Sequence, residues 1–157
     1  MLLSNEIRHG RHCVFQLHVH LVFVTKYRHR VLDGDAINRL RAIFSKVCAD
    51  FQAELVAMDG QDNHVHLLVN YPAKHSISTL VNSLKGVSSR MLRLERPDLM
   101  RRYWKGALWS PSYFAASCGD APIGILKAYI DSKTSRFNNL TGAYIPAQKG
   151  EVLRPHG

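Results

Sequence analysis

The apolar positions of this chain follow two alternating periods. Over residues 13–26 apolar and β-branched side chains recur at about every second position, which predicts a long strand. Over residues 34–51 the apolar positions lie three and four apart, which predicts a helix that Asp35 can cap. The change of period marks a first strand-to-helix connection.

The same alternation continues along the chain. Two short apolar runs, residues 53–60 and 64–71, predict two more strands separated by a polar turn. A helical pattern then runs from a cap at Ser76 or Ser78 to a stop at Pro97. We further expect a fourth strand over 112–119, a last helix over 120–137 with Pro122 in its first turn, and a loosely ordered tail over 138–157.

This order of elements, βαββαβα, predicts one α+β domain. The expected architecture is a ferredoxin-like (RRM-like) antiparallel sheet with helices on one face. The domain spans residues 1–157, with a core of about residues 10–137. The other face of such a sheet is open and commonly binds nucleic acids, although a fold alone does not establish a function.

Charge narrows the choice of partner. The chain has 21 Lys and Arg against 12 Asp and Glu, a formal net charge of +9. This excess favours a polyanionic partner, with a merely basic surface as the alternative. We expect no membrane span, because no apolar run approaches the ~18 residues required. The three scattered cysteines form no CxxC pair, which indicates reduced thiols and a cytoplasmic location.

The tripeptide HVH occurs twice, as His18 with His20 and as His64 with His66. In a strand, each pair places two imidazoles on the same face. The second pair follows an oxygen-rich turn that contains Asp62, and two imidazoles plus an oxygen make a partial metal shell with open positions. The first pair has no nearby carboxylate, which favours packed or hydrogen-bonded strand histidines.

Several stretches together resemble a known family. They are VHLVFVTKYRHRVL from Val19, NHVHLLV at 63–69, SLKGVSSRML at 83–92, LWSPSYFAASCG at 108–119 and YIDSK at 129–133. In this order they resemble the HUH endonuclease superfamily, and within it the single-tyrosine transposases of the insertion-sequence 200/605 class. The resemblance covers about residues 10–137 and selects the second HVH pair as the site.

The resemblance implies a transposase that cleaves and rejoins single-stranded DNA and recognises subterminal hairpins. It implies that His64 and His66 hold a divalent metal ion, Mg²⁺ or Mn²⁺, and that Tyr129 is the nucleophile that forms a 5′-phosphotyrosine link. It also implies a prokaryotic, cytoplasmic homodimer whose tyrosine helices are exchanged. The long apolar first strand is expected to be an exposed edge that pairs with its two-fold mate.

One position departs from the family pattern. Four residues after the tyrosine, where the family usually has a metal-binding Gln, this chain has Lys133, and an ammonium has no lone pair for a metal. Either another oxygen replaces the Gln, with Asp62 as first choice and Asp59 or Asn63 next, or Lys133 contacts the phosphate. Loss of activity is the remaining alternative.

Basic and polar residues in two segments are candidates for DNA binding by the same resemblance: Lys26, Arg28 and Arg30 after the first strand, and Lys85, Ser88, Ser89, Arg90 and Arg93 on the long helix. Tyr103, Trp104 and Trp109 can stack on bases or belong to the core.

Two other functions remain open. One is a non-catalytic nucleic-acid-binding module on the same fold. The other is a metal-free RNA phosphoesterase with two His-x-Thr/Ser motifs, but neither HVH copy has the hydroxyl residue that this chemistry requires.

Overall fold

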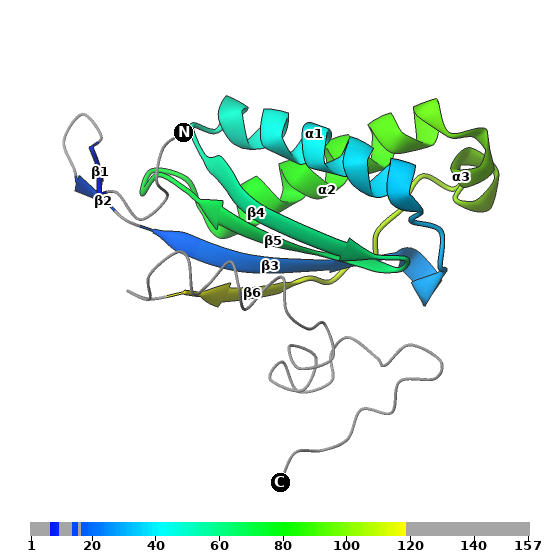
Figure 1. The fold of residues 1–157 in the computed structure, drawn as a ribbon, viewed down its shortest axis with the longest axis horizontal. Helices are drawn as coiled ribbons and strands as arrows, with labels where there is room; N and C mark the ends of the chain where they lie inside the picture. The colour runs from blue at the N-terminus through cyan, green and yellow to red at the C-terminus, as the bar shows by residue number, and fades with distance from the viewer. Residues whose placement is uncertain (1–6, 10–13, 16, 119–157) are drawn as a thin grey trace, which may run out of the picture.

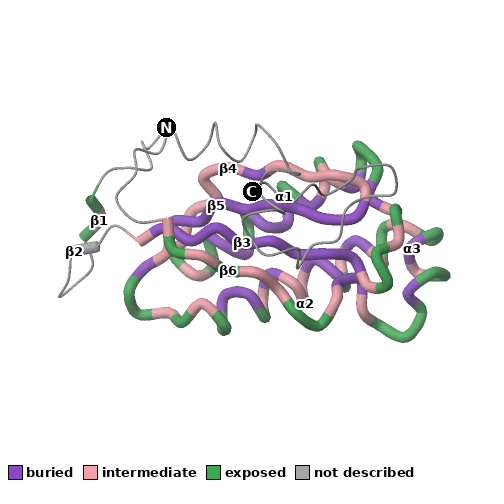
Figure 2. The backbone as a smooth tube through the Cα atoms, turned by 90° about the horizontal axis from the view of Figure 1, so that it is seen from below, coloured by how far each residue is buried: buried purple, intermediate pink, exposed green. Residues whose placement is uncertain are grey.

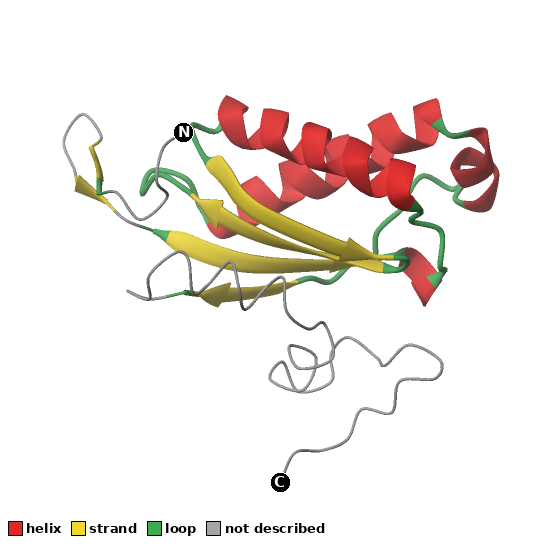
Figure 3. Cartoon of the chain, viewed as in Figure 1, coloured by secondary structure: helices red, strands yellow, loops and turns green. Residues whose placement is uncertain are grey.

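The computed structural model describes residues 7–9, 14–15 and 17–118. Two long helices lie side by side on one face of a four-stranded antiparallel sheet (Figures 1 and 3). The helices are α1 (Gly34–Asp50) and α2 (Ile77–Glu95), and the strand order is β4 (Glu54–Gln61), β5 (His64–Asn70), β3 (His18–Val24) and β6 (Phe114–Ser117). The α+β prediction is therefore confirmed. The tyrosine-bearing helix expected over 120–137 lies outside the described residues.

Strand β3 occupies an interior place in this sheet. It pairs with β5 on one side and with β6 on the other, where Leu21 faces Ala115. The expectation that the first strand is an exposed edge is therefore wrong, because the fourth strand covers it. The edges of this sheet are β4 and β6.

Alternation along the two central strands divides their side chains between two faces. Val19, Leu21 and Phe23 of β3 belong to the main core, as do the odd-numbered residues of β5. The core continues into α1 and α2 through their apolar faces. Both strands are buried along their whole length (Figure 2). The even-numbered side chains point to the face opposite the helices.

Strand β4 contains an irregularity that sets its register. The pairing with β5 shifts between Leu55 and Ala57, so that Val56 is an extra residue on the β4 side. Beyond this bulge, Asp59 faces His66 and Gln61 faces His64. The bulge thereby places odd-numbered residues of β4 beside the even-numbered histidines of β5.

The start of α1 differs from the prediction. Its N-cap is Asp33, whose side chain accepts a 2.8 Å hydrogen bond from the backbone N–H of Ala36. Arg96 donates to both oxygens of the same carboxylate at 2.9 and 2.8 Å, and this pairing lowers the pKa of Asp33. Asp35 lies in the first turn instead. Helix α2 begins after Ser76, one of the two predicted caps.

Short elements refine the other boundaries. The predicted strand over 13–26 is divided into β2 (Val14–Phe15), which pairs with β1 (Arg8–His9), and β3. Two short helices complete the described chain, η1 (Lys26–Arg28), which is a 3₁₀ turn, and α3 (Pro97–Arg102). Helix α3 begins at Pro97, the predicted stop of the preceding helix, because proline suits a first helical turn. Among the described helices, none is long and apolar enough to cross a membrane.

Candidate active site

The second HVH pair lies on β5, on the sheet face opposite the helices. His64 and His66 are 0% and 1% exposed, and Val65 between them points into the main core. Their ring centroids are 5.1 Å apart. The strand thus holds two buried imidazoles next to each other on a rigid backbone.

Each of these rings is oriented through its Nδ1 atom. Nδ1 of His64 lies 2.7 Å from the side-chain oxygen of Asn63, and because an amide oxygen only accepts, the proton is on Nδ1. Nδ1 of His66 lies 3.3 Å from Nε2 of His20 on β3. Such contacts at the far ring nitrogen fix the tautomer and the ring orientation of a metal-binding histidine.

Burial keeps the three imidazoles neutral. It lowers the pKa of His64 and of His20 to about 4, and the nearby Asp62 carboxylate opposes this shift at His64. The pKa of His66 falls to about 2, first because of burial and then because of its histidine neighbours. At neutral pH these side chains are therefore in the uncharged form that binds metal ions.

The residues present fit a bound divalent ion in part. Within the described part of the chain, the buried Nε2 of His64 has no hydrogen-bond partner, and with Nδ1 protonated it carries the lone pair. The described residues contain no group of three or more His, Cys, Asp and Glu that could hold a metal ion. Asp62 therefore does not join the pair in such a group, and one of its oxygens lies 3.8 Å from Arg30. Its role as a third ligand remains a prediction.

The two histidines of the first HVH pair contact different residues. His20 contacts His66, whereas Nε2 of His18 lies 3.3 Å from the side-chain nitrogen of Asn70. Sequence reasoning predicted packed or hydrogen-bonded strand histidines for this pair, but it did not identify His66 as the partner of His20. The repeated tripeptide was the available signal, but only the β3–β5 register shows that the two copies meet.

Tyr129 and Lys133 lie outside the described residues. Their predicted roles as nucleophile and as phosphate contact therefore remain predictions.

Comparison with known proteins places the chain in a family. The family model described as "Transposase IS200 like" matches residues 13–133. The chain belongs to this family. The family assignment makes it an enzyme of DNA transposition that cleaves DNA and transfers strands, and it confirms the resemblance seen in the sequence.

Individual relatives support the same family assignment. This transposase is 34% identical over 133 residues to the ISDra2 transposase TnpA of Deinococcus radiodurans, a match that covers 85% of this chain and 95% of that protein. A crystal structure of a chain from D. radiodurans R1 assigned as a transposase superposes with a TM-score of 0.66 at 34% identity, covering 79% of this chain and 95% of that one.

A more distant structure shares the fold alone. It is a REP-associated tyrosine transposase bound to a REP hairpin, with a TM-score of 0.53 and 14% identity over 87% of this chain and 74% of that one.

The basic residues after β3 lie in and beside η1 of the transposase. Arg28 and Arg30 are exposed and Lys26 is partly exposed. Arg90 on α2 is exposed as well. Their DNA contacts remain predictions that this exposure permits.

The other α2 candidates have structural roles. Ser88 is fully buried, and its hydroxyl accepts a 2.9 Å hydrogen bond from the indole N–H of Trp109. Ser89 is buried too and accepts from the backbone N–H of Leu108 at 3.0 Å. Their hydroxyls join α2 to the segment before β6, and contact of these serines with DNA remains a prediction.

Lys85 and Arg93 are also engaged within the transposase. The Lys85 ammonium donates to the carbonyls of Ser110, Pro111 and Ser112 at 2.7, 3.1 and 3.3 Å, and partial burial lowers its pKa. Nε of Arg93 donates to the backbone oxygen of Ser89 at 3.1 Å. Lys85 thus joins α2 to the Ser110–Ser112 segment, whereas Arg93 contacts Ser89 of its own helix. Contact of either side chain with DNA remains a prediction.

The aromatic candidates separate by burial. Trp109 and Tyr103 belong to the core, and burial raises the pKa of Tyr103 to about 12. Trp104 is 71% exposed. Only Trp104 of the three is available for stacking on a base.

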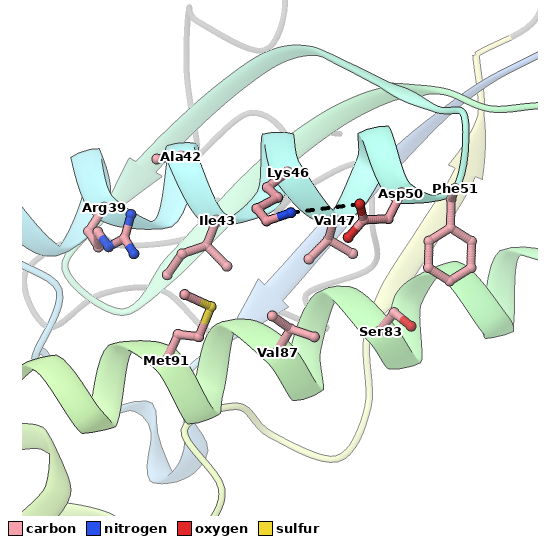
Figure 4. Close-up of a pocket in the computed structure, with 10 residues that line it drawn as sticks. All are labelled: Arg39, Ala42, Ile43, Lys46, Val47, Asp50, Phe51, Ser83, Val87 and Met91. Atoms are coloured by element: carbon pink, nitrogen blue, oxygen red, sulfur yellow. Dashed lines mark ion pairs between the residues drawn. The ribbon is translucent and has the colours of Figure 1, made fainter.

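A groove lies between α1 and α2 in the helical layer. Its volume is about 170 Å³, and Ile43, Val47, Val87 and Met91 form its apolar lining (Figure 4). It lies on the opposite side of the sheet from His64 and carries no residue of the candidate site.

We expect Ser88→Ala to reduce the free energy of unfolding by about 1–3 kcal/mol, since it leaves the buried indole N–H of Trp109 without its acceptor. Urea unfolding checks this value. Ser45→Ala on the exposed face of α1 is the matched control and should change stability by less than about 0.5 kcal/mol. Equal stability of the two variants would contradict the structural role.

Proposed function

We propose that this transposase cleaves and rejoins single-stranded DNA at insertion-sequence ends through a covalent bond to Tyr129. The observation that carries the proposal is the buried, neutral His64–His66 pair, with each Nδ1 held by a neighbouring side chain and the Nε2 of His64 without a partner in the described residues. Core packing alone would not favour burial of such a polar atom.

The proposed step exchanges one phosphodiester for another. The phenol oxygen of Tyr129 forms a bond to the scissile phosphorus, and the bond from phosphorus to the 3′-oxygen breaks. The phenol loses its proton and the departing 3′-oxygen gains one, so that a 5′-phosphotyrosine and a free 3′-hydroxyl remain. Reversal with a different 3′-hydroxyl joins a new strand without ATP. A purely hydrolytic nuclease would not need this intermediate.

His64 and His66 are the residues that would hold a divalent ion, Mg²⁺ or Mn²⁺, in this site. When bound, the ion neutralises charge on the scissile phosphate and orients it. Asn63 and His20 keep the two rings in place, as the geometry at their Nδ1 atoms supports. Val24 and Val22, the register partners of His64 and His66 on β3, are themselves buried.

The proposed substrate is single-stranded DNA with subterminal hairpins. The net charge of +9 supports a polyanionic ligand, and the distant structural relative is bound to a REP hairpin. A single strand also suits a site that has to receive one phosphate of one strand.

We further propose a homodimer in which the tyrosine helix of each subunit completes the site of the other. Excision involves two DNA ends, whereas one chain has a single Tyr129 and a single His64–His66 pair. Because β3 is interior, pairing between subunits would involve surfaces other than this strand.

A non-catalytic DNA-binding module is the second candidate. The replacement of the usual Gln by Lys133 favours it, since this substitution removes a metal ligand that the family normally has.

Tyr129→Phe should abolish the covalent protein–DNA adduct and leave DNA binding unchanged, because it removes the attacking oxygen and keeps the ring. A denaturing gel with labelled single-stranded DNA from the element's ends, in Mg²⁺ or Mn²⁺, measures the adduct. An adduct of undiminished yield in the variant would refute the role of Tyr129. Absence of an adduct in the unaltered chain would favour the non-catalytic module.

His64→Ala or His66→Ala should abolish cleavage and weaken Mn²⁺ binding at least tenfold by calorimetry, and a chelator should reproduce the loss of cleavage. His18→Ala is the matched control from the other HVH pair and should retain Mn²⁺ affinity. The assignment fails if all three folded variants bind Mn²⁺ like the parent chain.

Mixing the inactive Tyr129→Phe and His64→Ala chains should restore activity if sites are shared between subunits. The mixed dimer then contains one site with both an intact tyrosine and an intact histidine pair. A mixture that forms heterodimers but makes no adduct would argue against exchange of the tyrosine helices.

A further inference from the structure

An exposed aromatic and basic surface lies where β3 ends. Tyr27 is 74% exposed and Trp104 is 71% exposed, although both rings are large. A lysine accompanies each ring: Nζ of Lys26 is 5.4 Å from the ring centroid of Tyr27, and Nζ of Lys105 is 5.1 Å from that of Trp104. Exposed rings beside cations are the usual means by which proteins bind unpaired bases with their phosphates.

A cavity of about 250 Å³ connects the two rings. Its lining comes from η1 and from the end of α3 with the loop that follows: Lys26, Tyr27, Arg102, Tyr103, Trp104 and Lys105, with Gly106 and Ala107. We call this the Tyr27–Trp104 pocket. A second cavity of about 610 Å³ shares Lys26 and Tyr27 and extends toward Arg28 and the Ser110–Ser112 segment. Tyr27 therefore lines both cavities, with aromatic and basic neighbours in the first and with Lys26, Arg28 and two serines in the second.

The backbone that presents Tyr27 is strained and firmly held. Tyr27 and Arg28 have φ values of 61° and 57°, in the left-handed region that residues other than glycine rarely adopt. Hydrogen bonds hold the turn on both sides, from Thr25 Oγ1 to the carbonyl of His29 at 2.8 Å and from the Tyr103 hydroxyl to the carbonyl of Lys26 at 3.1 Å. Strained backbone of this kind gathers at functional sites.

The pocket begins at the His64 end of the sheet. Val24 is the register partner of His64, and the N–H of Thr25 donates to the carbonyl of Asn63 at 2.9 Å. Only Thr25 and Lys26 separate Val24 from Tyr27, so that at most ~11 Å of chain joins the two residues. Figure 3 shows η1 and α3 at this same end. A strand with one phosphate at the histidine pair could place a nearby nucleotide in the pocket.

We propose that the Tyr27–Trp104 pocket binds an unpaired nucleobase of single-stranded DNA. The base stacks on Trp104 and Tyr27, and its phosphate contacts Lys26, Arg102 or Lys105. The inference rests on the proposed function for the nature of the ligand. The unpaired base comes from a linear strand or is extruded from a hairpin, and both offer the same aromatic face.

Tryptophan fluorescence gives a direct test, because the chain has only two tryptophans and Trp109 is buried. The full chain is titrated in chelator, where no cleavage occurs, with an oligothymidine, with an abasic strand of equal length, with a fully paired hairpin and with the same hairpin carrying one bulged thymidine. We expect the oligothymidine to quench Trp104 and the abasic strand to leave it unquenched. Quenching by the bulged but not the paired hairpin identifies an extruded base as a ligand; quenching by the oligothymidine alone identifies a linear strand.

Trp104→Leu and Tyr27→Leu should each weaken oligothymidine binding about tenfold by anisotropy, and leave abasic-strand binding within about twofold. Leu94→Ala, at another exposed apolar residue outside the pocket, should bind like the parent chain. Trp104→Phe keeps an aromatic face and should recover most of the affinity. Thermal unfolding confirms that each variant is folded.

Parental oligothymidine affinity in both leucine variants, or equal quenching by the abasic strand, would overturn the pocket assignment. Neither result concerns the covalent adduct, so failure of the base pocket and failure of the proposed cleavage are distinguishable.

Discussion

The strict alternation of side chains along β3 and β5 is the constraint on which the site depends. The odd-numbered positions of both strands build the main core against α1 and α2, and the even-numbered positions carry the histidines. Any shift of register by one residue would exchange the two sets. Packing of the apolar side chains on one face of the sheet therefore also fixes the position of the imidazoles on the other face. The same two strands thus carry both the core and the candidate site.

Holding polar rings in such a place has an energetic cost that neighbouring groups offset. Burial depresses the pKa values of His20, His64 and His66, and a charged imidazole would be strongly destabilising there. Hydrogen bonding to Asn63 satisfies one nitrogen of His64, and His20 contacts His66. These contacts explain how a neutral pair can stay ordered in a site that a divalent ion would fill.

Local pattern predicted much of this molecule from its sequence. The periods of 2 and 3.6 residues located the four strands of the sheet and both long helices, and family motifs selected His64 and His66. What local pattern could not supply was pairing between distant segments. The contact of His20 with His66 depends on register across 46 residues, and the covering of β3 by β6 depends on sheet order. Ser88 looked like a polar surface residue because its partner, Trp109, is distant in sequence.

The bulge in β4 shows that strand length can matter as much as residue identity. Val56 is the extra residue that brings Asp59 beside His66 and leaves Met58 and Gly60 on the core side, where a methyl group on Gly60 would lie 2.5 Å from a carbon of Ile37. Deleting one residue at this point would point the Asp59 side chain toward the apolar core, and every family motif in the sequence would remain recognisable. A homologue could thus retain all recognisable signatures and still place a different side chain beside His66 through a change of spacing alone.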